Sequence, residues 1–110
     1  MPKKFPVPRE EQTEHYWKVL NEVIDPEVGI GLVDLGLIYD VEIDKKGLAT
    51  IKMTLTSPSC PVGPVLVQQV EDIMVVEIEE VKRAQVEIVW EPMWTSEKID
   101  PDLKELMFGL

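Results

Sequence analysis

The segment around Cys60 carries the residue type with the most distinctive chemistry. The chain reads Ser57-Pro58-Ser59-Cys60-Pro61, so this cysteine lies between two prolines and just before a predicted helix. Unpaired N–H groups at the start of a helix stabilise an anion, which favours the thiolate. A thiolate is both a nucleophile and a soft metal ligand. The position therefore indicates a functional thiol, and the alternative is a buried cysteine that packs as a small apolar residue.

Polar side chains that could serve this thiol occur in two places. Asp25 and Glu27 flank a proline, and two carboxylates at this spacing could bind metal or hydrogen-bond the cysteine loop. The alternative is a turn in which Asp25 bonds to nearby backbone, as is common before proline. Thr56 and Ser57 place hydroxyl groups directly before the cysteine turn. These hydroxyls could orient a ligand or the thiolate.

The inventory of reactive groups limits the chemistry further. One cysteine and one histidine exclude an internal disulfide, a self-contained four-thiolate site and a histidine-rich metal site. No Ser-His-Asp set or zinc-protease motif is apparent. A metal held by Cys60 must therefore take further ligands from another chain, a small thiol or carboxylates. We expect a protein that is not an enzyme, with a thiol-dependent enzyme as the least favoured alternative.

Composition and charge narrow the class of protein. The chain has 110 residues, of which 45% are hydrophobic, and this length allows one domain. We expect residues 1–8 to form a flexible lead-in and residues 9–110 to form the domain. A net charge of −10 without a basic stripe argues against nucleic-acid binding. Without an apolar stretch long enough for a bilayer, or a signal-peptide core, the expected location is the cytoplasm, away from membranes.

Hydrophobic periodicity predicts the helices. The first is marked by apolar residues at three- and four-residue spacing, namely Trp17, Leu20, Val23 and Ile24. It is expected to start at Arg9 and to end at the Asp-Pro step. A second helix is expected from Pro61, because proline loses nothing at a helix start. A short terminal helix should follow Asp100 as its N-cap, with Pro101 at the first helical position.

Alternating apolar and polar residues predict the strands. Residues 37–44 and 49–55 alternate on either side of a glycine-bearing turn, which indicates an antiparallel hairpin with Asp40 and Thr54 on the outer face. Residues 86–91 alternate as a third strand. The order αββαβα predicts an α+β fold in which the helices pack against a three-stranded sheet.

Three ordered segments resemble the signatures of a known family. They are Asp25-Pro26-Glu27-Val28-Gly29 with Val33-Asp34-Leu35-Gly36-Leu37-Ile38-Tyr39-Asp40, then Met53-Thr54-Leu55-Thr56-Ser57-Pro58-Ser59-Cys60-Pro61, then Val89-Trp90-Glu91-Pro92-Met93-Trp94-Thr95. From about Thr13 to about Asp102, the chain resembles the PaaD- and SufT-like family of metal–sulfur cluster assembly proteins, also called domain of unknown function 59. The resemblance implies an α+β domain that helps to mature iron–sulfur proteins, either as a carrier or as an adaptor to client apoproteins.

The resemblance also assigns residues. It places the family's reactive cysteine at Cys60, its acidic pair at Asp25 and Glu27, and its hydroxyl pair at Thr56 and Ser57. It implies a transient iron–sulfur cluster or iron at the cysteine, with no tightly bound cofactor. The implied partners are iron–sulfur assembly proteins and client apoproteins.

Two further expectations concern the cysteine and its surroundings. One thiolate per chain cannot close the coordination sphere of iron, so the metal would be shared with a second chain or an external ligand, and a homodimer is one way to share it. Ser59 stands where glycine is common in the family, and its side chain could change the backbone around the cysteine. The alternative function is a protein-interaction adaptor that binds no metal.

Overall fold

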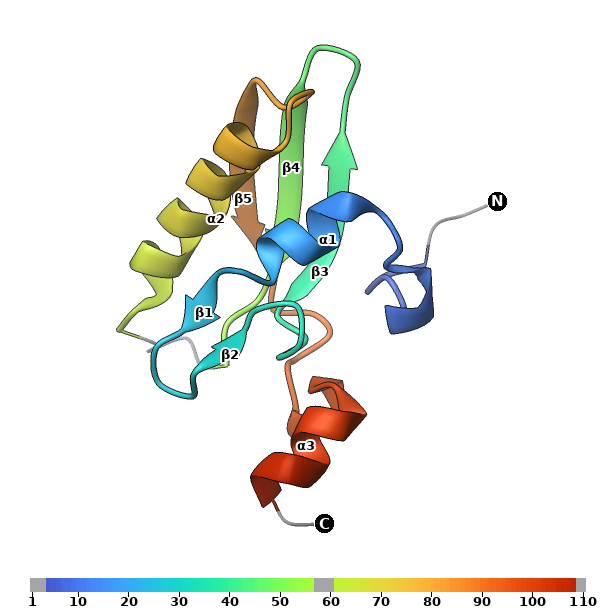
Figure 1. The fold of residues 1–110 in the computed structure, drawn as a ribbon, viewed down its shortest axis with the longest axis vertical. Helices are drawn as coiled ribbons and strands as arrows, with labels where there is room; N and C mark the ends of the chain where they lie inside the picture. Colours follow the sequence, from blue (N-terminus) through green and yellow to red (C-terminus); the bar gives the residue numbers. More distant parts are fainter. Residues whose placement is uncertain (1–3, 57–60, 109–110) are drawn as a thin grey trace.

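The fold combines helices with two small sheets (Figure 1). The computed structural model describes residues 4–56 and 61–108, with side chains as far as Glu105. Its elements in chain order are η1 (Arg9–Glu11), α1 (His15–Leu20), β1 (Ile24–Asp25), β2 (Ile30–Gly31), β3 (Ile38–Ile43), β4 (Leu48–Met53), α2 (Gly63–Glu77), β5 (Arg83–Ile88), η2 (Ser96–Lys98) and α3 (Pro101–Phe108). The predicted α+β class is confirmed.

The larger sheet has the strand order β3-β4-β5. Strands β3 and β4 form the predicted antiparallel hairpin, whereas β5 runs parallel to β4. A parallel neighbour needs a crossover connection, and α2 provides it. Helices α1 and α2 lie together in front of the sheet (Figure 1). The β1–β2 ribbon lies below them, towards the same end of the molecule as α3.

The core lies between the two helices and the sheet. Alternate residues of β4 carry it, because Ala49, Ile51 and Met53 are completely buried. From α2, Val70 and Met74 are buried equally deeply. Burying one such side chain stabilises the fold by about 1.5–3 kcal/mol. The residues of β4 that the alternation predicts to face inward are therefore the ones that lie in the core.

Two polar residues lie deeper than their place in the alternation predicted. Thr54 is fully buried, because β4 ends at Met53 and the Thr54 N–H donates to Leu37 O (2.9 Å). Asp40 is also buried, beside a register shift in β3. The N-terminal segment runs along this edge, where the Val7 N–H donates to the oxygen of the residue before Asp40 (2.9 Å). The prediction that the side chains of Asp40 and Thr54 lie on the outer face of the hairpin was wrong. The boundary after residue 8, between the lead-in and the domain, stays a prediction.

The first predicted helix is divided. In place of one helix up to the Asp-Pro step, the chain forms η1, the short helix α1 and then β1. Asn21 accounts for the early end, because its Oδ1 accepts the Asp34 N–H and its Nδ2 donates to Asp34 Oδ2, both at 2.9 Å. Gly31 lies so close that an added Cβ would be 2.2 Å from Asn21 O. Ile24, expected on the buried helix face, is 47% exposed on β1.

The C-terminal helix begins as predicted. The Asp102 N–H donates to Asp100 Oδ1 (2.9 Å), so Asp100 caps α3, and Pro101 is its first residue. The Asp100 N–H in turn donates to Asp34 O (2.7 Å) and ties this segment to the loop after β2. Within residues 4–56 and 61–108, no helix has the length and hydrophobicity needed to cross a membrane.

Candidate functional site

A pocket of about 270 Å³ lies where the β1–β2 turn, the residues after β4 and the segment before α3 meet. Its lining residues are Asp25, Glu27, Val28, Leu35, Thr56, Trp94, Ser96 and Ile99. The structure thus brings together three of the five predicted site residues, one of which, Thr56, is an exposed residue at the pocket wall. Cys60 and Ser57 lie outside the described residues, so their roles stay predictions.

Asp25 is the buried carboxylate of this pocket, with 5% of its surface exposed. Its Oδ1 accepts the Glu27 N–H (2.8 Å), and its backbone oxygen accepts the Gly29 N–H (2.7 Å). This is the turn anticipated as the alternative interpretation of the Asp-Pro step, except that it closes the β1–β2 ribbon instead of ending a helix. The turn fixes the carboxylate at the pocket and leaves Glu27 exposed at its rim.

Two aromatic side chains hold the opposite wall in place. Trp94 Nε1 donates to Leu35 O (2.8 Å), and the Tyr39 hydroxyl donates to Pro92 O (2.6 Å). Burial raises the pKa of Tyr39, so the phenol keeps the proton that it donates. Together these bonds fasten the residues after β5 to the start of β3. In the sequence, the only signal for Trp94 was its position in the third signature.

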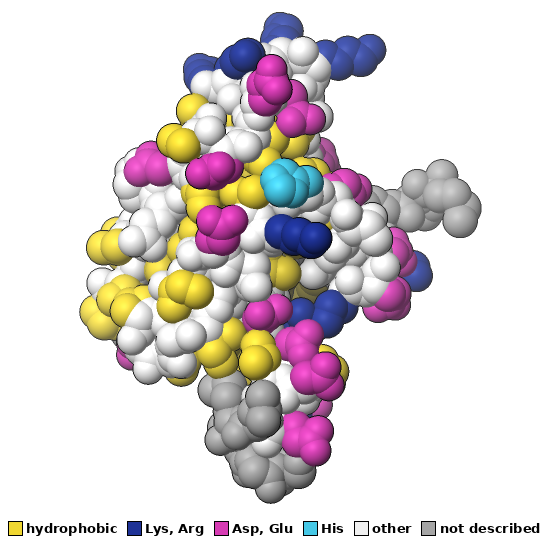
Figure 2. All heavy atoms as spheres, in the orientation of Figure 1, with side chains coloured by type: hydrophobic (Ala, Val, Ile, Leu, Met, Phe, Trp, Pro, Cys, Tyr) yellow, Lys and Arg dark blue, Asp and Glu magenta, His cyan; other side chains and the backbone are white. Residues whose placement is uncertain are grey.

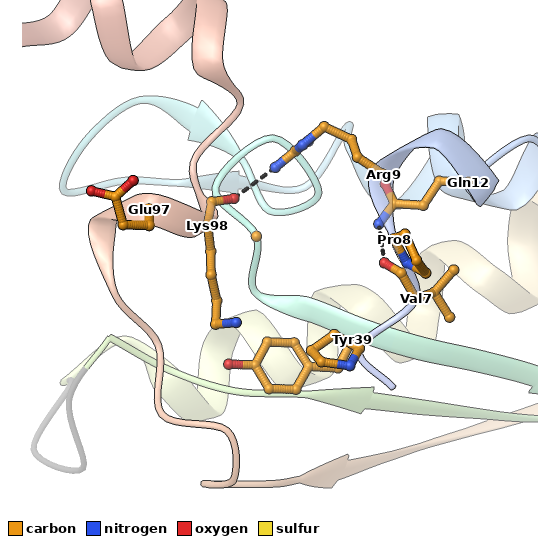
Figure 3. Close-up of a pocket in the computed structure, with 9 residues that line it drawn as sticks. Val7, Pro8, Arg9, Gln12, Tyr39, Glu97 and Lys98 are labelled. Carbon is orange, nitrogen blue, oxygen red and sulfur yellow. Dashed lines mark hydrogen bonds between the residues drawn. The ribbon is translucent and has the colours of Figure 1, made fainter. Parts of the chain in front are cut away.

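Arg9 fixes two further segments of the wall to each other. Its guanidinium donates to Lys98 O at 2.6 Å (Figure 3). It also donates to the carbonyl oxygens of Val33 and Asp34, both at 3.4 Å. It also lies 3.8 Å from a carboxylate oxygen of Asp100. These contacts hold the segment that contains Leu35 close to the segment that contains Ile99. Sequence reasoning did not find Arg9, because its partners lie far along the chain and are backbone atoms.

A second cavity of about 320 Å³ lies beside Arg9 and is lined by Val7, Tyr39 and Lys98 among others (Figure 3). The Lys98 ammonium lies 5.3 Å from the centre of the Tyr39 ring. An ammonium at this distance from an aromatic face is in cation–π range. Of the predicted site residues that the structure describes, none lines this cavity, so the pocket at Asp25 is the candidate site.

The pocket offers acceptors and a hydrophobic wall. Asp25 and Glu27 contribute carboxylates, Thr56 and Ser96 contribute hydroxyls, and Trp94 contributes an aromatic face. Among the residues that the structure describes, no three or more His, Cys, Asp or Glu side chains are grouped to hold a metal ion. The described part of the site is therefore suited to support a cation or a polar ligand whose other bonds come from elsewhere.

Comparison with known sequences places this chain in a family. Residues 16–88 match the profile of a family described as iron-sulfur cluster assembly protein. The Fe-S protein maturation auxiliary factor YitW of Bacillus subtilis (strain 168) is 45% identical over 86 residues, which cover 78% of this chain and 83% of that protein. The Fe-S protein maturation auxiliary factor SufT of Staphylococcus aureus (strain USA300) is 49% identical over 75 residues, covering 68% and 84% respectively.

Solved structures agree with this assignment. A domain of unknown function 59 from Bacillus anthracis superposes with a TM-score of 0.78 at 36% identity, over 86% of this chain and 88% of that one. A conserved hypothetical protein from Thermotoga maritima gives a TM-score of 0.71 at 35% identity, over the full length of both chains. The chain belongs to the iron–sulfur cluster assembly family that includes SufT and is also called domain of unknown function 59.

Proposed function

We propose that this chain is an auxiliary factor in the maturation of iron–sulfur proteins, and that Cys60 holds iron or a cluster transiently before an apoprotein receives it. The observation that carries the proposal is the pocket around the buried Asp25, which Thr56 lines. Thr56 precedes Cys60 by four residues. A chain of four residues spans at most about 14 Å between Cα atoms, so the sequence itself keeps the two residues close.

The chemistry of the pocket suits a temporary site. A carboxylate pair and a hydroxyl group can orient a ligand or a metal-bound water, while a single thiolate supplies the soft ligand. Because these groups do not close the coordination sphere of iron, the metal keeps exchangeable positions. Exchangeable ligands allow transfer to a client that offers more thiolates. The chain needs no substrate turnover of its own for this task.

The test is anaerobic reconstitution with ferrous iron and sulfide. Wild-type protein should take up iron and acid-labile sulfide and develop visible absorbance, whereas Cys60→Ala should remain colourless. A Cys60→Ser variant, which retains a weaker oxygen ligand, separates loss of the thiolate from loss of side-chain volume. Colourless wild-type protein at high concentration, or equal iron content in the wild type and Cys60→Ala, would overturn the carrier role.

The second candidate is an adaptor that binds client proteins without metal. It is favoured by exposed apolar side chains close to the pocket, since Met93 is 74% exposed beside Trp94, and Val28 is 47% exposed in the lining. A pull-down with a purified iron–sulfur apoprotein distinguishes the two candidates. An adaptor binds the client equally well as wild type and as Cys60→Ala, with no iron in either preparation. A carrier shows iron that depends on Cys60.

A further inference from the structure

A groove of about 500 Å³ runs between β1 and α2, on the other side of β1 from Asp25. Its lining residues are Glu22, Val23, Ile24, Gln69, Asp72, Ile73 and Val76. Val23 is buried at its floor, while Ile24 and Val76 are 47% and 76% exposed. In the space-filling view, hydrophobic side chains gather over α2 and β1, with acidic side chains beside them (Figure 2).

The most exposed apolar side chain of the groove, Val76, contributes little to the stability of the fold. Val76 is largely in solvent, and a β-branched residue is a weaker helix former than alanine or an unbranched polar residue. Single exposed apolar residues are ordinary on protein surfaces. Here, however, Ile24 and Val76 border the same groove from two different elements. A shared apolar groove of this kind is typical of a contact surface.

The groove also carries negative charge, although Asp72 Oδ1 accepts a hydrogen bond from Gln68 Nε2 (2.8 Å) on the same helix. The charged lining residues are two carboxylates, Glu22 and Asp72. Helix α2 contains no lysine or arginine, ends at Glu77 and is followed by Glu79 and Glu80. Lysine or arginine side chains of a partner would complement Glu22 and Asp72.

We propose that the groove docks an amphipathic segment of a protein partner, with apolar side chains between Ile24 and Val76 and lysine or arginine side chains against Glu22 and Asp72. A second copy of this chain is disfavoured, because two acidic rims would meet and each chain carries a net charge of −10. Only the partner's class rests on the proposed function: it is an assembly protein or a client. Since Ile24 and Asp25 are consecutive on β1, such a partner would dock directly beside the candidate site.

The test uses a synthetic helical peptide of leucine and lysine, in which leucine occupies one face. The controls are a scrambled peptide of equal composition and a leucine–glutamate peptide. Binding to isotopically labelled protein, followed by NMR, should shift the amide signals of residues 22–24 and 69–76 and weaken as salt increases. Val76→Ser should reduce affinity by about tenfold, as should the double change Glu22→Gln with Asp72→Asn.

The matched control is Val75→Ser, because Val75 is 42% exposed on the same helix but does not line the groove. Its affinity should stay within about twofold of wild type. The inference is overturned if Val75→Ser and Val76→Ser weaken binding equally, if the shifts lie elsewhere, or if the scrambled peptide binds as well. It is also overturned if sedimentation shows self-association that Val76→Ser abolishes, since the groove then holds a second copy.

Failure of this inference can be told apart from failure of the proposed function. Cys60→Ala should bind the peptide with wild-type affinity, because the lining of the groove that the structure describes comes from residues 22–24 and 69–76. Likewise, Val76→Ser should take up iron as the wild type does. Loss of peptide binding with normal iron uptake would overturn only the docking proposal. Normal peptide binding without iron uptake would overturn only the carrier role.

Discussion

The turns that begin at Asp25 and Asp44 use the same local chemistry in two different environments. In each, the carboxylate accepts the N–H of the residue two positions later at 2.8 Å. A glycine with positive φ follows in both, Gly29 at 73° and Gly47 at 87°. Asp44 is exposed at the end of the β3–β4 hairpin, whereas Asp25 is 5% exposed and lines the pocket.

The difference separates a turn that is packed into the fold from one that lines the candidate site. The Asp44 turn is packed into the structure, because Gly47 O accepts the N–H groups of Lys82 (2.7 Å) and Arg83 (3.1 Å). Its carboxylate is solvated as well as hydrogen-bonded. The Asp25 turn instead buries a carboxylate, which gives up hydration on folding and accepts the Glu27 N–H in its place. An uncharged residue could form the same turn at a lower cost in hydration. The charge of Asp25 therefore points to a role in the candidate site.

Alanine at the two glycines should produce the largest contrast. At Gly47 an added Cβ would lie 2.7 Å from Lys82 Cγ and 2.9 Å from Glu80 O, in addition to the positive φ. Gly47→Ala should therefore lower the free energy of unfolding by about 2–4 kcal/mol. At Gly29 no atom lies within 4 Å of the added Cβ, so Gly29→Ala should cost only the backbone strain, about 1 kcal/mol.

Urea denaturation of both variants measures this contrast. Iron uptake per folded chain should be unchanged by Gly47→Ala, because the hairpin end is remote from the pocket lining. Equal losses of stability for the two glycine variants would contradict the assignment of the Asp44 turn to the fold.

Replacing Trp94 should have an intermediate effect, at the wall of the pocket. Trp94→Phe keeps an aromatic ring but removes the Nε1–H that donates to Leu35 O at 2.8 Å. The expected loss is about 1 kcal/mol of unfolding free energy, together with reduced iron uptake in reconstitution. Trp90→Phe is the matched control, since Trp90 is 42% exposed and does not line the pocket. If both variants behave alike, the Trp94 wall has no part in the site.

The smallest expected effect is a pH dependence of the Asp44 turn. The N–H of Leu48, followed by those of Lys46 and Gly47, holds the pKa of Asp44 below its usual value of 3.8. The ionised carboxylate therefore stabilises the folded state above pH 3.8, and this contribution is lost as pH falls through the lowered pKa. Asp44→Asn should be less stable than wild type near neutral pH, with a gap that narrows in acid.

Urea midpoints measured from neutral pH down to pH 3 test this sign. Glu79→Gln, which changes an exposed carboxyl outside the turn, controls for loss of a negative charge. A gap between wild type and Asp44→Asn that is independent of pH would show that the hydrogen bonds to the carboxylate do not favour its ionised form.

The regular parts of the fold could be predicted because their signals are local. Alternation marks β4, and an Asp-Pro step marks the start of α3. The division of the first helix could not be predicted in this way, because it depends on Asn21 and Asp34 meeting across the chain. Strands of two residues, such as β1, show no periodicity of their own.

The candidate site was predicted in part for the same reason. Asp25, Glu27 and Thr56 were identified from residue type and family resemblance, and the structure places all three at one pocket. Trp94 and Arg9 act through bonds to backbone oxygens of distant segments, which residue type does not reveal. Cys60 and Ser57 lie outside the described residues and stay predictions.

The most direct test compares iron bound per chain after anaerobic reconstitution of wild type, Asp25→Asn and Asp44→Asn. Asparagine keeps an oxygen for the turn hydrogen bond in both variants, while it removes the charge and replaces the other oxygen with an NH2 group. The predicted result is that Asp44→Asn matches wild type while Asp25→Asn binds iron about tenfold less tightly. If Asp25→Asn loads as well as wild type, or both variants lose iron equally, the pocket at Asp25 is not the site that Cys60 serves.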